Sequence, residues 1–430
     1  MTVEPGLLLF GLFFLLLFLG VPILTAVGVT ALVFLWRFDL GIQVTAANVY
    51  ANIAKFPLLA IPFFILAGFV MERAGLSRSL VNVLNLLVGP VRGGLALVTL
   101  GGCVLFGAIS GTGPADTAAI GTVMIPAMAA GGYATGFAAA LVAAAATTDV
   151  LIPPSVAFVV YGVITETSVS RLFAAGVVPG LLMGLALVLP ALLVSRRHGW
   201  GGGGAWGTWR QLGRAVWEAK WGLAAPVVIL GGIYGGVFTP TEAAVVAVAY
   251  GLVVGLVVSR TLRVGDLYGI FRDAAVATAT VMIVVAFAGL FSWTGSTLGV
   301  MDRAARGLLG ISQNPYLVLL LLNGMLLVAG MLLDAISIYY VLLPVFLPLL
   351  PRFGWDPVWF GVMMTVNLAI GTITPPVAVN LYVASNIAGT RMEEISRWVI
   401  PFVLALVGAL LLVTYVPALT LWLPDVLGVR

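Results

Sequence analysis

Apolar runs of membrane-spanning length follow one another along almost the whole chain, separated by short polar loops. A spanning helix needs roughly 20 apolar residues. Only 8% of the 430 residues are charged, whereas about 25% are charged in an average soluble protein. So few charges cannot cover the surface of a soluble globule of this size. We therefore interpret the chain as a multi-pass membrane protein, and exclude a soluble enzyme, a nucleic-acid-binding protein and a disordered chain.

Cysteine and histidine each occur once, which limits the possible chemistry. Cys103 allows neither an internal disulfide nor a thiolate metal cluster. His198 lies in a polar loop, which removes histidine metal sites and most general-base schemes.

The N-terminus has no positively charged region before its apolar run and no small-residue cleavage site after it. We expect the first segment to be a retained membrane helix rather than a signal peptide.

The apolar runs predict the order of the helices. The first run, 7–36, is interrupted at Gly20-Val21-Pro22 and predicts one long, tilted or kinked helix. A helix near the membrane interface is expected over 72–92, and 195–220 is the main linker, basic and rich in tryptophan as at a membrane interface. Other full spans are predicted over 56–71, 136–164, 172–194, 221–237, 242–258, 274–297, 359–387 and 398–423.

The basic residues predict the orientation. Four loops, 72–92, 195–220, 260–273 and 391–397, hold thirteen of the twenty lysine and arginine residues, so we place them on the cytoplasmic side. The runs 93–109 and 117–130 then have to start and end on that side, although each is short for a span. They predict a re-entrant hairpin that enters from the cytoplasm. The same reasoning predicts a second hairpin, about 314–350, that enters from the opposite side.

The two halves of the chain share the spacing of their landmark residues, which indicates an internal repeat. Each half contains a Pro-Pro pair inside an apolar run, Pro153-Pro154 and Pro375-Pro376. The other matched spacings are ten residues, for Asp116–Pro126 and Asp334–Pro344, and twenty-five residues, for Pro154–Pro179 and Pro376–Pro401. Inverted repeats with broken helices are typical of secondary transporters. The predicted fold is an all-α polytopic membrane protein, an inverted-repeat transporter with two re-entrant hairpins and two broken helices.

The Pro-Pro pairs predict where binding occurs. Proline has no N–H donor and disfavours a helical residue before it, so the helices should break around 149–155 and 371–377. Broken helices offer carbonyl oxygens to a cation and N–H groups to a carboxylate. The alternative is a plain proline kink, but the break occurs twice at symmetric positions. The tips at 107–117 and 330–337 should face the break of their own half, giving two cation sites that flank one substrate site. The substrate-cavity candidates are Thr112, Asp116, Ser155, Asp334, Ser337, Pro376 and Asn380.

Three carboxylates, Asp116, Asp149 and Asp334, fall at membrane depth. A charge there costs roughly 2.5–3.5 kcal/mol on insertion scales, so each needs a partner or a function. Asp116 and Asp334 could coordinate an ion, cap a hairpin helix, or do both. For Asp149, which lies beside a break, we favour a functional role. In contrast, Thr239-Pro240-Thr241-Glu242 has the pattern of a capping box, which we interpret as structural.

The chain resembles the large membrane subunit of tripartite ATP-independent periplasmic (TRAP) transporters over essentially its whole length. The segments that carry the resemblance are 56–64, 110–126, Ile152-Pro153-Pro154-Ser155 with Tyr161-Gly162, 235–244, and Thr374-Pro375-Pro376-Val377 with Asn380-Leu381. The resemblance implies a subunit of the bacterial inner membrane, without enzyme activity or cofactor, that takes up an organic acid with Na⁺ as the coupling ion. It implies an elevator-type transporter, in which the hairpins and broken helices carry the substrate across while a scaffold stays fixed. It also implies two partners, a small four-helix membrane subunit and a periplasmic substrate-binding protein. No small subunit precedes residue 1, so we expect it to be a separate chain.

The resemblance also assigns residues and domains by position. One sodium site would use Gly107, Ser110, Asp149, Ile152 and Pro154, and Asp149 stands where a small residue such as glycine is expected. The other would use Gly330, Gly371, Thr374 and Val377, mostly through backbone carbonyls. The expected divisions are a first scaffold region (1–92), a first transport repeat (93–166), scaffold helices with the basic linker (167–313), a second transport repeat (314–390) and a C-terminal scaffold helix (391–430).

Three other functions fit parts of the sequence. A self-sufficient sodium/carboxylate symporter would work without a binding protein. An intramembrane aspartyl protease would use two buried aspartates, but Asp116 and Asp334 lie at hairpin tips expected to enter from opposite sides. A passive channel is a third possibility, although hairpins that close over a midplane site fit alternating access better.

Overall fold

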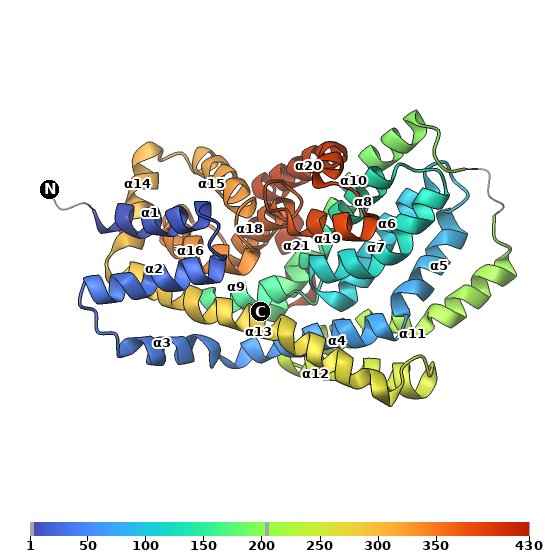
Figure 1. Ribbon diagram of the computed structural model, residues 1–430, viewed down its shortest axis with the longest axis horizontal. Helices are drawn as coiled ribbons and strands as arrows, with labels where there is room; N and C mark the ends of the chain where they lie inside the picture. The colour runs from blue at the N-terminus through green and yellow to red at the C-terminus, as the bar shows by residue number, and fades with distance from the viewer. Residues whose placement is uncertain (1–3, 203–205, 430) are drawn as a thin grey trace.

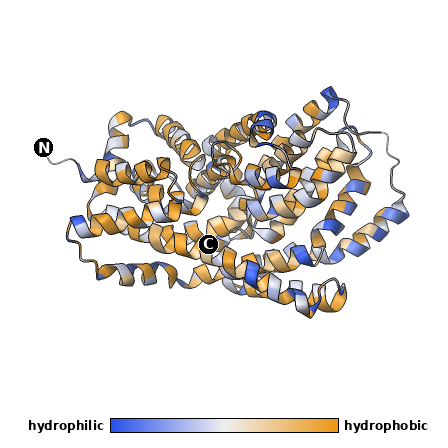
Figure 2. Ribbon diagram, viewed as in Figure 1, coloured by the Kyte–Doolittle hydropathy of each residue, from blue (hydrophilic) through white to orange (hydrophobic). Residues whose placement is uncertain are grey.

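The computed structural model describes residues 4–202 and 206–429, which form helices and contain no β-strand within these ranges. Figure 2 shows apolar residues along most of the helical length and polar residues mainly at helix ends. Among the described residues, six helices are long and apolar enough to cross a bilayer, as expected for a multi-pass membrane protein. They are Phe56–Arg73, Val169–Arg197, Trp209–Tyr234, Pro240–Val258, Val264–Thr297 and Met392–Tyr415.

Five helices from distant parts of the sequence pack into one layer, which we call the scaffold layer (Figure 1). They are α2 (Ile23–Arg37), α3 (Val44–Ile53), α4 (Ala60–Arg73), α12 (Pro240–Leu252) and α13 (Val264–Thr297). A short 3₁₀ turn, η1 (Phe56–Leu59), precedes α4, and a π-helical segment, η3 (Val253–Val258), continues α12. The 34 residues of α13 contact α2, α3 and α4 in turn, so this helix joins the layer along its length.

The first repeat consists of a helical hairpin and a broken helix. The hairpin, called the first hairpin, pairs α6 (Gly94–Ser110) with α7 (Gly113–Ala130) through two residues. The broken helix runs through α8 (Thr135–Ala145) and the 3₁₀ turn η2 (Ala146–Val150). It is interrupted over 151–155, the first break, and resumes as α9 (Val156–Thr165).

The second repeat has the same order of elements. The second hairpin consists of α15 (Pro315–Gly330) and α16 (Ala335–Phe346), and the short α17 (Leu349–Phe353) follows it. The broken helix consists of α18 (Pro357–Gly371), the second break over 372–378, and α19 (Val379–Ala388). Both hairpins and both breaks therefore form where the sequence predicts them. Their entry into the membrane from opposite sides stays a prediction.

The two repeats pack against each other through their broken helices. α19 of the second repeat contacts α7 and α8 of the first, and α18 contacts η2 and α9. The long helices α10 (Val169–Arg197) and α20 (Met392–Tyr415) contact each other, and both contact α8 and α18. At the start of α10, the Arg171 guanidinium lies 3.9 Å from the Asp356 carboxylate and 3.5 Å from that of Asp425. Arg171 thus links three helix ends, consistent with an orienting rather than a substrate-binding role.

Several expectations about element boundaries are wrong. The expected loops 260–273 and 391–397 are helical from Val264 and from Met392 on, because α13 and α20 begin there. The first apolar run is not one kinked helix, because α1 (Pro5–Phe18) and α2 are separate and pack against each other. Gly20 allows this reversal by adopting a φ of +80°. The second half of the 195–220 linker is helical, since α11 (Trp209–Tyr234) begins with a capping box at Thr208 and Gln211. The last run is divided into α20 and α21 (Ala418–Leu427), with Pro417 between them.

Two amphipathic helices lie outside the predicted full spans. α5 (Leu76–Val88) occupies most of the expected interfacial segment 72–92 and packs against α6 and α11. α14 (Val300–Ile311) follows α13 and contacts α1 and α16. No helix is predicted from the sequence at α14, because its apolar residues form one narrow face rather than a continuous run.

Candidate functional site

The tip of the first hairpin lies directly against the first break. The Ser110 hydroxyl donates a hydrogen bond to the Asp149 carboxylate, with Oγ 2.7 Å from Oδ2. A Cβ on Gly107 would overlap the same carboxylate, and a Cβ on Gly111 would overlap the Pro154 carbonyl oxygen. Gly111 also has a φ of +67°, which favours glycine. The structure thus brings together four residues of the first predicted sodium site, Gly107, Ser110, Asp149 and Pro154.

The fifth residue of that set, Ile152, occupies a different environment. Its side chain packs towards α10, where a Cβ on Gly180 would lie 2.8 Å from the Ile152 Cγ1. Its backbone N–H donates to the Thr148 carbonyl at 3.1 Å. Ile152 therefore anchors the break to α10, and only its carbonyl oxygen is left to serve a cation site.

The tip of the second hairpin lies against the second break in a similar way. A Cβ on Gly371 would lie 2.6 Å from the Cα and the carbonyl oxygen of Gly330, so the two backbones touch. The Val377 N–H donates to the Met331 carbonyl at 3.2 Å. The Thr374 hydroxyl donates to the Ile370 carbonyl at 2.7 Å. All four residues of the second predicted sodium site therefore lie at one hairpin–break contact.

The structure changes which aspartate positions correspond between the two halves. Asp334 is the N-cap of α16 and lies 41 residues before Pro375, whereas Thr112 is the N-cap of α7 and lies 41 residues before Pro153. Asp116 lies in the first turn of α7, four residues after that cap. Asp116 and Asp334 are thus not equivalent, although the ten-residue spacing to a proline indicated that they are. Asp149 and Gly371 do correspond, each four residues before its Pro-Pro pair.

The capping interpretation is confirmed for Asp334 and wrong for Asp116. The Asp334 carboxylate accepts hydrogen bonds from the Ile336 N–H at 3.0 Å and the Ser337 N–H at 3.1 Å. The Ser337 hydroxyl donates to the same carboxylate. In contrast, both oxygens of the Asp116 carboxylate are buried without a hydrogen-bond partner. The predicted capping box is also present, because the Glu242 N–H donates to Thr239 Oγ1 at 3.3 Å and Glu242 Oε2 accepts from the Thr239 N–H at 2.8 Å.

The remaining substrate-cavity candidates do not share one environment. Ser155 is buried, caps α9 and donates to the Val150 carbonyl at 2.5 Å. Asn380 is buried between the repeats, and its amide donates to the Ala143 carbonyl at 3.4 Å. Pro376 is exposed at the second break. The structure buries Asp116, Ser155, Ser337 and Asn380, whereas it exposes Pro376. Substrate contact by these residues stays a prediction.

Chemically, each hairpin–break contact is suited to a small hard cation. The ends of α6 and η2, and those of α15 and α18, leave backbone carbonyls without intrahelical partners. Hydroxyl oxygens of Ser110 and Thr374 lie beside those ends, and the first contact adds the Asp149 carboxylate. Unwound carbonyls of broken helices coordinate Na⁺ in transporters, while half-helix N-termini favour anions.

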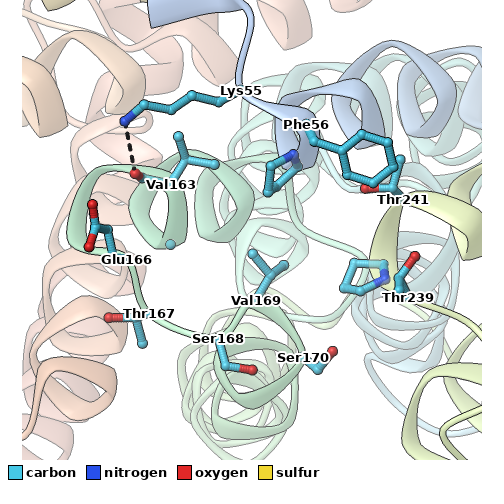
Figure 3. Close-up of a pocket in the computed structure, with 13 residues that line it drawn as sticks. Lys55, Phe56, Val163, Glu166, Thr167, Ser168, Val169, Ser170, Thr239 and Thr241 are labelled. Atoms are coloured by element: carbon cyan, nitrogen blue, oxygen red, sulfur yellow. Dashed lines mark hydrogen bonds between the residues drawn. The ribbon is translucent and has the colours of Figure 1, made fainter.

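A cavity of about 760 Å³ lies at the end of α9 away from the first break, between the scaffold layer and the α9–α10 turn (Figure 3). Lys55 crosses from the scaffold side, and its Nζ donates to the Val163 carbonyl at 3.3 Å. Phe56 and Thr239 line the scaffold side, while Glu166 and Ser168 line the other. No binding role is predicted for these residues from the sequence alone. Two of the segments that carry the family resemblance, 56–64 and 235–244, meet here. Their motifs are the feature of the sequence that could have indicated this cavity.

Residues 10–419 match the family described as "Tripartite ATP-independent periplasmic transporter, DctM component". The isethionate TRAP transporter permease protein DctMQ of Oleidesulfovibrio alaskensis is 44% identical over 98% of this chain and 66% of its own length. The C4-dicarboxylate TRAP transporter large permease protein DctM of Pseudomonas aeruginosa is 40% identical over 90% of this chain and 91% of its own.

Among solved structures, the YdaH transporter of Alcanivorax borkumensis has a similar fold. Its TM-score is 0.65, with 16% sequence identity, over 96% of this chain and 98% of that one. At that identity the similarity concerns the fold alone. It shows that this arrangement of helices also occurs in a transporter of distant sequence.

Proposed function

The chain belongs to the DctM family and is the large membrane subunit of a TRAP transporter, and from this premise we propose that it performs sodium-coupled uptake of an organic acid through its two hairpin–break contacts. It is a multi-pass protein of the bacterial inner membrane and a transporter subunit, not an enzyme. The observation that carries the proposal is the direct contact of each hairpin tip with the break of its own repeat.

Sodium coupling is supported by the oxygen atoms at those two contacts. Each contact combines carbonyl ends of broken helices with a serine or threonine hydroxyl, Ser110 in the first and Thr374 in the second. A bound cation would hold a hairpin tip on its break and so favour the closed, substrate-loaded form. A ligand shifts a conformational equilibrium only through a difference in affinity between the two states, and such a tip-closing site supplies that difference.

An organic acid as substrate is supported by the relatives and by the helix ends. The two relatives named above carry isethionate and C4-dicarboxylate in their names, which are small organic anions. In the first repeat, α7 begins at the hairpin tip and α9 at the break. In the second repeat, α16 begins at the tip and α19 at the break. Helix N-termini attract anions through free N–H groups and the helix dipole.

For the motion, we propose that both repeats move as one body against the scaffold layer. We place α10 and α20 in the moving body, in place of the scaffold role expected from the sequence, because both pack against α8 and α18. Lys55 and Val163 then lie on opposite sides of the sliding boundary, and the Lys55 hydrogen bond would hold one end state. The 760 Å³ cavity lies at the same boundary and would change shape during transport.

Two partners follow from the tripartite family. A small membrane subunit would brace the scaffold layer, and a periplasmic binding protein would deliver the substrate. The alternative is a self-sufficient symporter. Reconstitution in proteoliposomes tests this: we expect uptake only when the binding protein, the small subunit and an inward Na⁺ gradient are all present. Uptake by this chain alone would favour the alternative, and uptake driven equally well by K⁺ would contradict sodium coupling.

Cysteine accessibility tests the elevator motion. Cys103 is replaced by alanine, and Thr112→Cys reports on the first tip, where the native side chain is half-buried and makes no capping bond. Ser259→Cys, exposed at the end of η3, is the matched scaffold control. We expect labelling at position 112, but not at 259, to change between Na⁺ and choline. Equal labelling of the tip in both salts, in a variant that still transports, would contradict the motion.

A further inference from the structure

We propose that Asp116 and Asp149 together hold one Na⁺ ion beneath the tip of the first hairpin, which makes Asp116 a cation ligand rather than a substrate contact. The inference rests on the sodium coupling proposed above. It adds a second carboxylate to the first cation site and so gives the two repeats cation sites of different charge.

The first reason is that both carboxylates are buried and incompletely bonded. Asp116 and Asp149 are each 0% exposed. Both oxygens of Asp116 and the Oδ1 of Asp149 have no hydrogen-bond partner. Burial of a carboxylate without partners carries a large desolvation cost, which a bound cation removes. Structural caps do not leave such atoms, as the fully bonded Asp334 shows within the same chain.

The second reason is that the fold brings these carboxylates to one place. Asp149 lies against Gly107 and Ser110 of α6. Asp116 lies in the first turn of α7, which packs against both α6 and η2, the segment that contains Asp149. A Cβ on Gly113, in the same turn, would lie 3.2 Å from the Ala146 carbonyl oxygen of η2. Like charges at this depth repel each other strongly, because the surroundings are apolar. A cation between them converts that repulsion into two attractions.

A third side chain offers an unbonded oxygen atom. The side-chain oxygen of Asn380 is also buried without a partner. Asn380 packs against Gly113, which lies one turn before Asp116 on α7: a Cβ on Gly113 would be 3.2 Å from that oxygen. An amide oxygen is a good ligand for a hard cation and adds no charge. Since Asn380 belongs to the second repeat, occupancy of this site would also stabilise the contact between the repeats.

The second repeat differs in that its tip carboxylate, Asp334, is fully bonded as the cap of α16. Gly371 occupies the position that corresponds to Asp149, and there the backbone of Gly330 fills the space. Thr112 occupies the position that corresponds to Asp334. The second contact therefore relies on neutral oxygens, whereas the first has two carboxylates. We expect the first site to bind Na⁺ more tightly and to fill first.

The test measures Na⁺ binding and thermal unfolding of the full-length permease, purified with its small subunit, in NaCl and in choline chloride. In the wild type we expect Na⁺ to raise the unfolding temperature. Asp116→Asn should bind one ²²Na⁺ fewer per chain, or bind it at least tenfold more weakly, and should lose most of the Na⁺-dependent shift. In choline it should unfold no earlier than the wild type, since an unpaired buried charge has been removed.

Asp334→Asn is the matched control, because it removes a carboxylate whose role is capping. It should lower the unfolding temperature in both salts and keep the Na⁺-dependent shift. Asp149→Gly, which introduces the residue found at position 371, should lose the same ion as Asp116→Asn. The double variant should then lose no more than either single variant, because both residues serve one ion.

The outcomes separate this inference from the proposed function. Wild-type Na⁺ affinity in Asp116→Asn would overturn the inference and leave sodium coupling intact. No Na⁺ response in the wild type would instead contradict sodium coupling itself. A shift with CaCl₂ but not with NaCl would show that the carboxylates select a divalent cation, which also overturns the assignment to Na⁺. If Asp116→Asn does not fold, Asp116→Ser decides by the same binding measurement.

Discussion

Gly330 and Gly371 are in direct backbone contact, with a Cβ on Gly371 falling 2.6 Å from the Cα of Gly330. This contact fastens the second hairpin to the second break, and the Val377 N–H adds a hydrogen bond to Met331 beside it. Two backbones approach this closely only where neither residue has a side chain. The tip can therefore approach its break this closely because neither Gly330 nor Gly371 has a Cβ atom.

Gly371→Ala should push the second tip away from its break. Inserting a methyl group into packed backbone costs about 1–3 kcal/mol, and here the displaced atoms include the proposed sodium ligands. We expect at least a tenfold loss of sodium-driven uptake in proteoliposomes and a lower unfolding temperature. Gly324→Ala is the control, because a Cβ at that position of α15 meets no atom within 4 Å. Wild-type uptake by Gly371→Ala would show that the close contact is not required.

Thr374→Ala should weaken the second sodium site. The hydroxyl of Thr374 lies at the second break, where it donates to the Ile370 carbonyl. We expect the Na⁺ concentration for half-maximal uptake to rise several-fold, with little change in unfolding temperature in choline. Thr372→Ala is closely matched, since that hydroxyl makes a similar bond, 2.7 Å to the Ala369 carbonyl, but is not in the proposed site. An unchanged sodium dependence in Thr374→Ala would count against this residue as a ligand.

Pro376→Ala should lower transport by allowing the helix to continue through the second break. Proline lacks the N–H that a helix needs, and alanine restores that donor. Pro226→Ala, inside the continuous helix α11, is the control and should leave uptake unchanged. The measurement is uptake at saturating Na⁺, so that a change in sodium affinity does not hide the effect. Full activity of Pro376→Ala would contradict the functional importance of the break.

Asn323→Ala should destabilise the second repeat through a buried polar chain. The Asn367 amide donates to Asn323 Oδ1 at 2.6 Å, and the Asn323 amide donates to the Thr414 hydroxyl at 3.1 Å. Removing Asn323 leaves a buried donor unpaired, which costs about 1–3 kcal/mol. We expect a lower unfolding temperature in both NaCl and choline. Asn323→Ala combined with Asn367→Ala should cost less than the sum of the single changes, and strict additivity would indicate that the chain is not coupled.

Features set by local chemistry could be predicted from the sequence. The breaks at Pro153-Pro154 and Pro375-Pro376 follow from missing N–H donors, and the capping box at Thr239 follows from two side chains three residues apart. The hairpin–break contacts were also predicted, because each tip and its break belong to one repeat. Equivalences that rest on spacing alone were less secure. Asp116 and Asp334 share a ten-residue spacing to a proline, yet only Asp334 is a cap.

Features that depend on contacts between distant segments could not be predicted. Nothing near Gly20 indicates whether the chain continues as a kinked helix or folds back, because the choice depends on how α1 and α2 pack together. The helices α10 and α20 resemble scaffold spans by length and composition, but their packing partners are α8 and α18. Lys55 carries no motif of its own, and its bond to Val163 spans 108 residues of sequence.

By itself the sequence determined the membrane class, the two hairpins and the two breaks, because apolar length and missing backbone donors act locally and do not depend on neighbours. The tertiary structure alone decided the state of each carboxylate. Asp334 is fully bonded, Asp149 is bonded in part, and Asp116 is not bonded at all. The cost of a buried charge depends on which atoms from other helices surround it, and only the folded chain brings those atoms together.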